Sequence, residues 1–263
     1  MKKGICLGSL PGDSLEAKFR LAREAGFDGV EINTLTNEED RRRYKEIADA
    51  VGIEIPSIMN SKHWAKPLSD PDPKVREESA RGVIDSIETA AVVGADTVLL
   101  VPAVVTEEVT YEEAYERSQS EIRKLIGYAQ EKGVYIAVEN VWNKFLLSPI
   151  EFKAYVDSFK SPWVKAYFDI GNHVKYAPPQ EWIRSLGKLI AKCHVKDFKL
   201  NPDGHGGRFC RIGEGSIDWP AVRRALDEVG YNGWLTNESG GLSLAELSRR
   251  FDLIIAGKDP AKG

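Results

Sequence analysis

The sequence has few cysteines, few histidines and no long apolar run. Its three cysteines, Cys6, Cys193 and Cys210, cannot all pair with one another, which excludes a disulfide framework and favours a reducing compartment. No segment approaches the roughly 20 apolar residues that a membrane helix needs. We therefore expect a cytoplasmic protein without a membrane partner, whose first residues form a strand and not a signal peptide.

The chain also lacks an excess of positive charge. It contains 36 Lys and Arg residues against 40 Asp and Glu residues, so its formal net charge is −4. Proteins that bind nucleic acid usually carry a basic face, and this composition argues against such a partner. With 42% hydrophobic and 29% charged residues, the composition is typical of a soluble globular protein.

The sequence does contain a regular alternation of short apolar runs and longer amphipathic segments. Helix start signals separate the runs, among them Thr110 with Glu113 and Ser243 with Glu246. The predicted strands are residues 5–7, 29–32, 53–58, 97–101, 134–138, 164–168, 189–195 and 233–236. The longest irregular stretches, 60–71 and 198–216, both follow strands, and loops of this length in a compact domain are often functional.

Eight strand–helix units in 263 residues average about 33 residues each. Strict alternation requires parallel strands, and eight such units predict one (β/α)8 TIM barrel over residues 1–263. The alternative is an open, doubly wound sheet with a glycine-rich nucleotide loop after the first strand. The turn there, Gly8-Ser9-Leu10-Pro11-Gly12, does not match that fingerprint, and no Walker-type loop is present.

Ionisable residues stand at the ends of four consecutive predicted strands: Glu139, Asp169, His194 and Glu238. Adjacent parallel strands lie about 4.8 Å apart, so these side chains can converge at the barrel mouth, where catalytic groups of such barrels lie. Three carboxylates cannot gather as anions without a cation. The set predicts a divalent metal site, with Mn²⁺ or Mg²⁺ favoured and Co²⁺ or Zn²⁺ as alternatives. Any one of these residues alone could instead cap a helix or form an ion pair.

Several motifs around these positions resemble the xylose isomerase-like TIM barrels, a family of sugar phosphate isomerases and epimerases. The resemblance covers nearly the whole chain and rests on Val138-Glu139-Asn140, Phe168-Asp169-Ile170-Gly171-Asn172, His194-Val195-Lys196-Asp197, the segment 213–218 and Glu238-Ser239. The family includes ketose 3-epimerases, pentulose-5-phosphate 3-epimerases, hydroxypyruvate isomerase and inosose dehydratase.

The resemblance implies that Glu139, Asp169, His194 and Glu238 are metal ligands and that Glu139 and Glu238 also act as acid and base. It implies a ketose or ketose phosphate as substrate, reacting through a metal-stabilised enediolate. It also implies a homodimer or homotetramer. The metal site is shared across the family's reactions, so it does not identify the sugar.

Further residues are candidates for contacting the substrate. Lys196 shares side-chain parity with His194 and should point to the barrel axis, where it binds an anionic group or pairs with Asp197 or Glu238. The aromatic rings can cover sugar C–H surfaces, and the loop arginines can bind a phosphate. Glu31 either holds a substrate hydroxyl or orients His63. The candidates are His173, Lys196, Trp142, His63, Trp64, Arg208, Arg211 and Glu31. For each, a structural role without ligand contact is the alternative.

Three other functions are compatible with parts of this pattern. An inosose-dehydratase-like lyase would use the same metal site and then expel a hydroxyl group. An abasic-site endonuclease shares this barrel, but it needs a histidine-rich multi-metal site and a duplex-binding surface, which four histidines and a charge of −4 disfavour. A non-catalytic binding protein would not need two glutamates placed as an acid–base pair.

Overall fold

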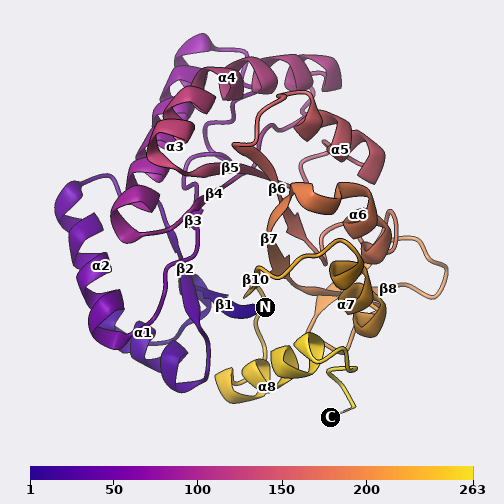
Figure 1. Cartoon of the computed structure of the whole chain (residues 1–263). Helices are drawn as coiled ribbons and strands as arrows, with labels where there is room; N and C mark the ends of the chain where they lie inside the picture. The colour runs from indigo at the N-terminus through magenta and orange to yellow at the C-terminus, as the bar shows by residue number, and fades with distance from the viewer. Residues whose placement is uncertain (263) are drawn as a thin grey trace.

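Parallel strands form a closed barrel at the centre of the computed structural model, which describes residues 1–262 (Figure 1). In the order in which they neighbour one another, the strands are β1 (Lys2–Cys6), β10 (Trp234–Asn237), β7 (Ile190–Val195), β6 (Val164–Asp169), β5 (Tyr135–Glu139), β4 (Thr97–Leu100), β3 (Ile58–Met59) and β2 (Gly29–Asn33). The pairing of β1 with β10 closes the ring. The predicted single (β/α)8 barrel is therefore confirmed.

Helices surround the barrel as an outer ring (Figure 1). They are α1 (Leu15–Glu24), α2 (Glu38–Val51), α3 (Pro73–Val93), α4 (Tyr111–Lys132), α5 (Pro149–Asp157), α6 (Pro179–Leu186), α7 (Trp219–Glu228) and α8 (Leu244–Ile255). The residues predicted to start helices form capping hydrogen bonds at the N-termini of α4 and α8. Thr110 and Glu113 form both halves of a capping box at α4, and Ser243 accepts a hydrogen bond from the Glu246 N–H at α8.

Two strand predictions are wrong in position. Residues 53–58 were expected to form the third strand, but β3 is only Ile58–Met59, with an isolated bridge between Gly29 and Glu54 before it. Pro56 lies between these two contacts and has no N–H to donate, which interrupts the ladder. The first strand ends at Cys6, and Leu7 begins a short 3-10 helix, η1 (Leu7–Ser9).

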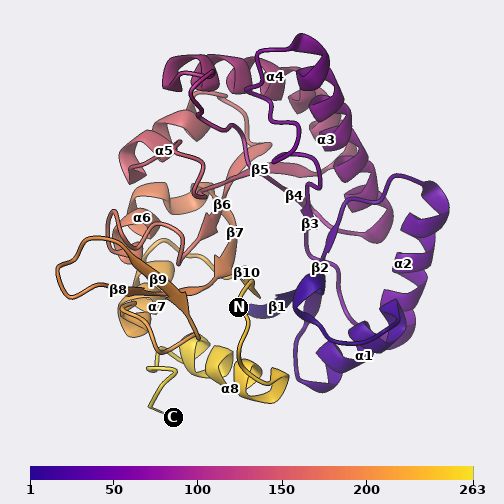
Figure 2. The same cartoon turned by 180° about the vertical axis from the view of Figure 1, so that it is seen from behind.

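The predicted loop 198–216 contains regular structure. An antiparallel hairpin, β8 (Asp197–Leu200) and β9 (Gly207–Cys210), lies beside α7 (Figure 2). The Asp197 carboxylate holds the base of this segment, because it accepts hydrogen bonds from the backbone N–H groups of Gly213 and Gly215 and from Trp219 Nε1. A side chain at Gly215 would collide with Asp197, whose Oδ1 lies 1.9 Å from where a Cβ would stand.

Apolar packing divides into a large and a small cluster. The large cluster fills the space between strands and helices, where Phe19, Phe152 and Trp182 are fully buried. The small cluster, Leu99, Ala137 and Tyr167, is separate from it. Tyr167 stands two residues before Asp169 in β6, so the two side chains point to the same side of the strand. The small cluster therefore forms an apolar layer beneath the polar strand ends.

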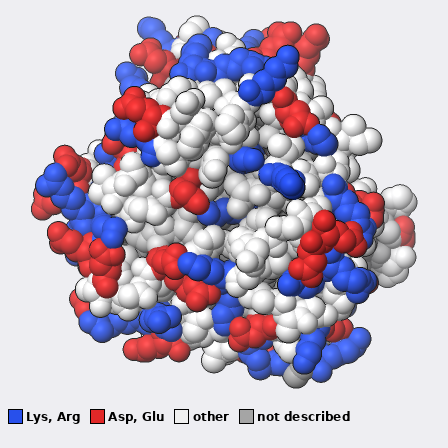
Figure 3. Space-filling model, viewed as in Figure 1, with Lys and Arg blue, Asp and Glu red and all other residues white. Residues whose placement is uncertain are grey.

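Among residues 1–262, no helix is long and apolar enough to cross a membrane. On the face shown in Figure 3, acidic and basic side chains are interspersed, and neither sign covers a continuous area. That face has no uniform basic surface of the kind that a nucleic-acid duplex attracts.

Candidate active site

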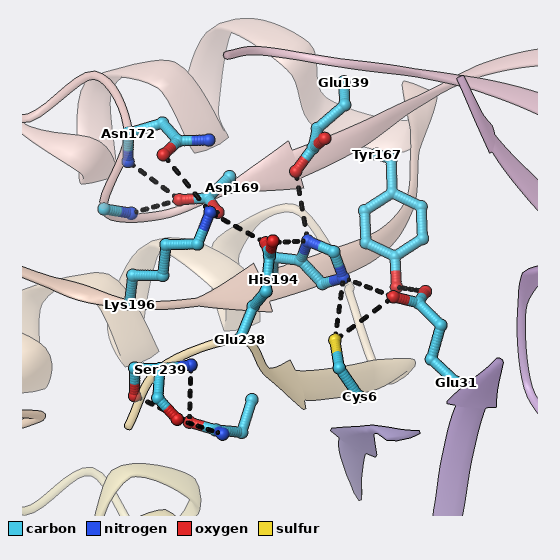
Figure 4. Close-up of polar contacts among 12 residues, drawn as sticks. Cys6, Glu31, Glu139, Tyr167, Asp169, Asn172, His194, Lys196, Glu238 and Ser239 are labelled. Carbon is cyan, nitrogen blue, oxygen red and sulfur yellow. Dashed lines mark hydrogen bonds and ion pairs between the residues drawn. The ribbon is translucent and has the colours of Figure 1, made fainter. Parts of the chain in front are cut away.

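The four predicted metal ligands converge at one end of the barrel (Figure 4). Glu139 and Asp169 are the last residues of β5 and β6, His194 lies in β7, and Glu238 follows β10. One ligand atom from each lies within 4.8 Å of the other three. His194 Nδ1 is 3.0 Å from Glu139 Oε1 and 2.8 Å from Glu238 Oε2.

Backbone contacts fix the position of Asp169. Its backbone N–H donates to Asn140 Oδ1 and its carbonyl accepts from Asn140 Nδ2, so the side chain of Asn140 continues the pairing of β5 with β6. Asp169 Oδ1 accepts the backbone N–H groups of Gly171 and Asn172. A Cβ at Gly171 would lie 2.7 Å from the Cβ of Lys196, which explains the glycine in this turn.

Lys196 points into the cluster, as its parity with His194 predicted. Its Nζ lies 2.7 Å from Glu238 Oε2 and 3.0 Å from Asp169 Oδ2. These two oxygens are buried and accept no hydrogen bond within residues 1–262. They interact with Lys196 through ion pairs. Two buried carboxylate oxygens that face a cation, together with a third carboxylate and an imidazole, are a donor set that suits a divalent metal.

The electrostatics of the cluster separate its two glutamates. Burial raises the pKa of Glu139 above its ordinary value. Burial acts in the same direction on Glu238, but His194 and Lys196 outweigh it and hold the pKa of Glu238 well below the usual range. Burial opposes the charge on Lys196, yet Asp169, Glu139 and Glu238 raise its pKa overall. Burial therefore favours the protonated form of Glu139, whereas His194 and Lys196 keep Glu238 ionised.

Glu31 contacts His194, whereas the sequence suggested that it either holds a substrate hydroxyl or orients His63. Glu31 Oε1 lies 2.7 Å from His194 Nε2, and Oε2 accepts hydrogen bonds of 2.6 Å from both Ser57 Oγ and the Tyr167 hydroxyl. The Cys6 thiol is 3.4 Å from Glu31 Oε1. Figure 4 shows His194 between Glu139 and Glu238 on one side and Glu31 with Cys6 on the other.

Two of the predicted histidines are buried and bonded to backbone groups. His63 Nδ1 accepts the Val101 N–H at 3.2 Å, and His173 Nε2 donates to the Val141 carbonyl at 3.1 Å. Burial lowers the pKa of each to about 4, so both rings are neutral. The His173 ring packs against Trp182, while Trp64 beside His63 is exposed.

Trp142 lies beside the β8–β9 hairpin. Its indole N–H donates to the Asn172 carbonyl at 2.6 Å, and its ring stacks on Phe209 of β9 with centroids 5.0 Å apart. Lys175 Nζ lies 3.8 Å from the centroid of the Trp142 ring. About half of the Trp142 side chain remains exposed, so an aromatic surface faces solvent near the cluster.

Two pockets meet at Glu238. The larger, of about 520 Å³, is lined by Lys196, Glu238, Phe209, Arg211, Ser239 and Gly240, among others. The smaller, of about 240 Å³, lies on the side of β1 and β2, where Cys6 and Glu31 line it. Of the two predicted arginines, Arg211 therefore borders the larger pocket. Arg208 is an exposed residue of β9 paired with Lys199 of β8.

Four residues of the site were not among the predicted ones: Tyr167, Ser57, Cys6 and Phe209. Tyr167 carried a usable signal, because it stands two residues before Asp169 and must share its side of the strand. Ser57 stood at the end of a predicted strand, but nothing in the sequence pairs it with Glu31. Phe209 could not be placed without knowing the hairpin.

Comparisons with known proteins identify the family of the chain. A family model described as "Xylose isomerase-like TIM barrel" matches residues 19–251. A Haemophilus influenzae protein provisionally named L-ribulose-5-phosphate 3-epimerase is 27% identical over 247 residues, which cover 88% of this chain and 86% of the relative. The Bacillus velezensis protein named inosose isomerase is 25% identical over 237 residues, covering 85% of this chain and 82% of the relative.

Solved structures show the same fold. A D-tagatose 3-epimerase-like protein superposes with a TM-score of 0.81 at 22% identity, covering 95% of each chain. A D-psicose 3-epimerase superposes with a TM-score of 0.76 at 20% identity, covering 94% of this chain and 89% of the other.

Proposed function

The chain belongs to the xylose isomerase-like TIM barrel family, and on that premise we propose that it is a sugar isomerase or epimerase that depends on a divalent metal. The observation that carries the proposal is the convergence of Glu139, Asp169, His194 and Glu238 within 4.8 Å beside a pocket of about 520 Å³. The names of the relatives, which include 3-epimerases of ketoses and of a pentulose phosphate, support a ketose or ketose phosphate as substrate.

The four converging residues would hold the metal, and the set favours Mn²⁺ or Mg²⁺ because carboxylates outnumber imidazole in it. A divalent ion there supplies a Lewis acid that stabilises the negative charge developing on a substrate when a C–H proton next to a carbonyl leaves. Lys196, in contact with Asp169 and Glu238, adds a second positive charge beside the same pocket.

The two glutamates would move the proton. Glu238 borders both pockets and its pKa is held low, so its carboxylate suits the base that accepts the proton from carbon. Glu139 lies deeper, and burial raises the pKa that it has without a metal, so of the two glutamates it would more readily carry the proton that is returned. Neighbouring groups whose environments drive their pKa values apart commonly divide these two roles. Return to the opposite face of the same carbon is epimerisation, and return to the neighbouring carbon is isomerisation.

Substrate contacts would come from the residues around the larger pocket. Phe209 and Trp142 offer aromatic faces for sugar C–H groups, and Arg211 offers a guanidinium group for an anionic end of the substrate. Ser239 and Gly240, which follow Glu238, complete the border of this pocket.

The test is proton exchange in D₂O with Mn²⁺ and a panel of ketoses and ketose phosphates. We expect deuterium at C3, or at C1 for a 1,2-isomerase, on at least one sugar. Glu139→Gln and Glu238→Gln should each lower the rate by about 10²-fold or more, the usual contribution of a positioned acid or base. Glu121→Gln is the matched control, because Glu121 is a buried glutamate of α4 that pairs with Arg76 and Lys124.

Two results would contradict the proposal. A metal-loaded protein that exchanges no proton of any ketose would not be an isomerase or epimerase of these sugars. Full activity of either glutamine variant would show that the substituted glutamate does not transfer the proton. A product that has lost water, seen as a mass decrease of the sugar, would instead indicate the lyase reaction on the same site.

A further inference from the structure

Glu31 is a carboxylate that is almost fully buried, although it is not one of the four proposed metal ligands. It lies in β2, which is separated from β7 by β1 and β10 in the barrel order. Its side chain reaches His194 of β7 and contacts Nε2 at 2.7 Å, on the side of the ring opposite to Glu139 and Glu238. We infer that Glu31 is a positioning residue that fixes the orientation and the tautomer of His194.

Three neighbours hold the Glu31 carboxylate in place. Ser57 Oγ and the Tyr167 hydroxyl both donate to Oε2 at 2.6 Å, and the two donors come from different parts of the barrel. Oε2 is thereby satisfied, which leaves Oε1 for His194 and for the weak donor Cys6 Sγ. Tyr167 also packs against the His194 ring, with centroids 4.6 Å apart. One tyrosine thus fixes both the carboxylate and the imidazole that it contacts.

A neutral imidazole has one N–H donor and one nitrogen with a free lone pair. When a metal takes the place of the proton on Nδ1, a carboxylate fixed at Nε2 keeps the remaining proton on Nε2, and the lone pair of Nδ1 then faces the metal site beside Glu139 and Glu238. A histidine that binds a metal commonly donates its other N–H to a carboxylate in this manner. This inference rests on the metal site of the proposed function.

The same atoms allow a competing arrangement. Cys6, Glu31 and His194 also lie close enough together to hold an ion of their own, which would bind Nε2 in place of the proton. The donor chemistry opposes this arrangement. Glu31 Oε2 already accepts two hydroxyl groups. A hydrogen-bonded Nε2 therefore fits these residues better.

Calorimetric titration of the full chain with Mn²⁺ tests the inference without any sugar. We expect one ion per chain and an affinity that falls about 10- to 100-fold in Glu31→Ala, the usual effect of removing such a partner. Glu31→Gln should recover part of the loss, because its amide oxygen can still accept the Nε2 proton. Glu121→Gln is the control for loss of a buried carboxylate and should bind like the wild type.

Tyr167→Phe provides a second variant if Glu31→Ala fails to fold, because it removes one donor to Glu31 and keeps the carboxylate. We expect a smaller loss of affinity, of a few fold. Tyr155→Phe is its matched control, since the Tyr155 hydroxyl is also buried and bonded to a serine, Ser118. That pair joins the helices α5 and α4 and does not involve the strand ends that carry the cluster. Affinities of Glu31→Ala and Tyr167→Phe within twofold of the wild type would overturn the inference.

Nitrogen-15 NMR of the Zn²⁺-loaded protein supplies a readout that a merely structural role would not change. We expect an Nε2-bound proton of His194 in slow exchange and shifted downfield, and its loss in Glu31→Ala. Two ions per chain in the titration, with no such proton, would overturn the inference in favour of the second ion site. A wild type that binds metal but exchanges no ketose proton would contradict the proposed function and leave the role of Glu31 intact.

Discussion

At the scale of single residues, His194 joins two polar networks. Its Nδ1 faces Glu139 and Glu238, the two residues proposed to transfer the proton. Its Nε2 faces Glu31, whose carboxylate accepts hydrogen bonds from Ser57 and Tyr167. Buried polar groups of this kind are costly when left unpaired. Any substitution on one side of the ring is therefore expected to affect the other side.

Arg211 and Arg208 provide a test of the substrate's charge. Arg211 borders the larger pocket, whereas Arg208 is exposed on β9. If the substrate carries a phosphate, Arg211→Gln should raise its KM about 10-fold or more, the effect of losing a hydrogen bond to a charged group. The KM of the unphosphorylated sugar should stay the same. Steady-state kinetics of both sugars measures this.

Arg208→Gln is the matched control, since it removes an arginine from the same hairpin without touching the pocket. Equal KM values for the wild type and Arg211→Gln on every phosphorylated sugar would show that Arg211 does not bind the substrate. A rise for both arginine variants would indicate general attraction by the hairpin's charge and no specific subsite.

Strand parity and chemical type were enough to predict the four converging residues and the inward direction of Lys196. They were not enough to predict that Glu31 contacts His194 and not His63. That contact crosses the barrel mouth between strands that are not neighbours, and no local sequence pattern encodes it. Which of the ligand and substrate roles the residues perform stays a prediction until activity is measured.

At the scale of elements, β-strand order and helix caps followed from the sequence, but two features did not. Pro56 interrupts the predicted third strand, so that β3 begins only at Ile58, and the hairpin of β8 and β9 was predicted as an irregular loop. The hairpin strands are four residues each, too short for alternation to stand out against the glycines around them. Tertiary contacts, chiefly those of Asp197, hold that segment in place.

Asp197→Ala should loosen the whole segment from Phe198 to Gly215. The carboxylate accepts hydrogen bonds from Gly213, Gly215 and Trp219. A hydrogen bond to a charged group contributes about 1.5–3 kcal/mol net, and contributions within one network are not additive. We expect the free energy of unfolding to fall by about 2–4 kcal/mol. Chemical denaturation of the metal-free protein measures this change without involving the metal.

Asp203→Ala is the control within the same segment. Asp203 is exposed and accepts one hydrogen bond from the His205 N–H. Its removal should change the free energy of unfolding by no more than about 0.5 kcal/mol, as is usual for exposed positions. If both variants lose the same stability, Asp197 does not anchor the segment.

At the scale of the whole molecule, the closed barrel brings together residues that are far apart in the chain. Glu31 and His194 are separated by 163 positions, and Glu139 and His194 by 55. The net charge of −4 is then not evenly spread, because Glu139, Asp169 and Glu238 place three carboxylates at one end of the barrel. Lys196 supplies one compensating positive charge there, and a divalent ion would balance the remaining carboxylates.

Anomalous diffraction from crystals grown with Mn²⁺ is the most direct test of this charge balance and of the proposed metal site. We predict one anomalous peak per chain, from an ion coordinated by Glu139, Asp169, Glu238 and His194 Nδ1. We also predict that the Lys196 ammonium moves away from Asp169 Oδ2. No peak among these four residues at saturating Mn²⁺, or a peak bonded to His194 Nε2 beside Cys6 and Glu31, would contradict it.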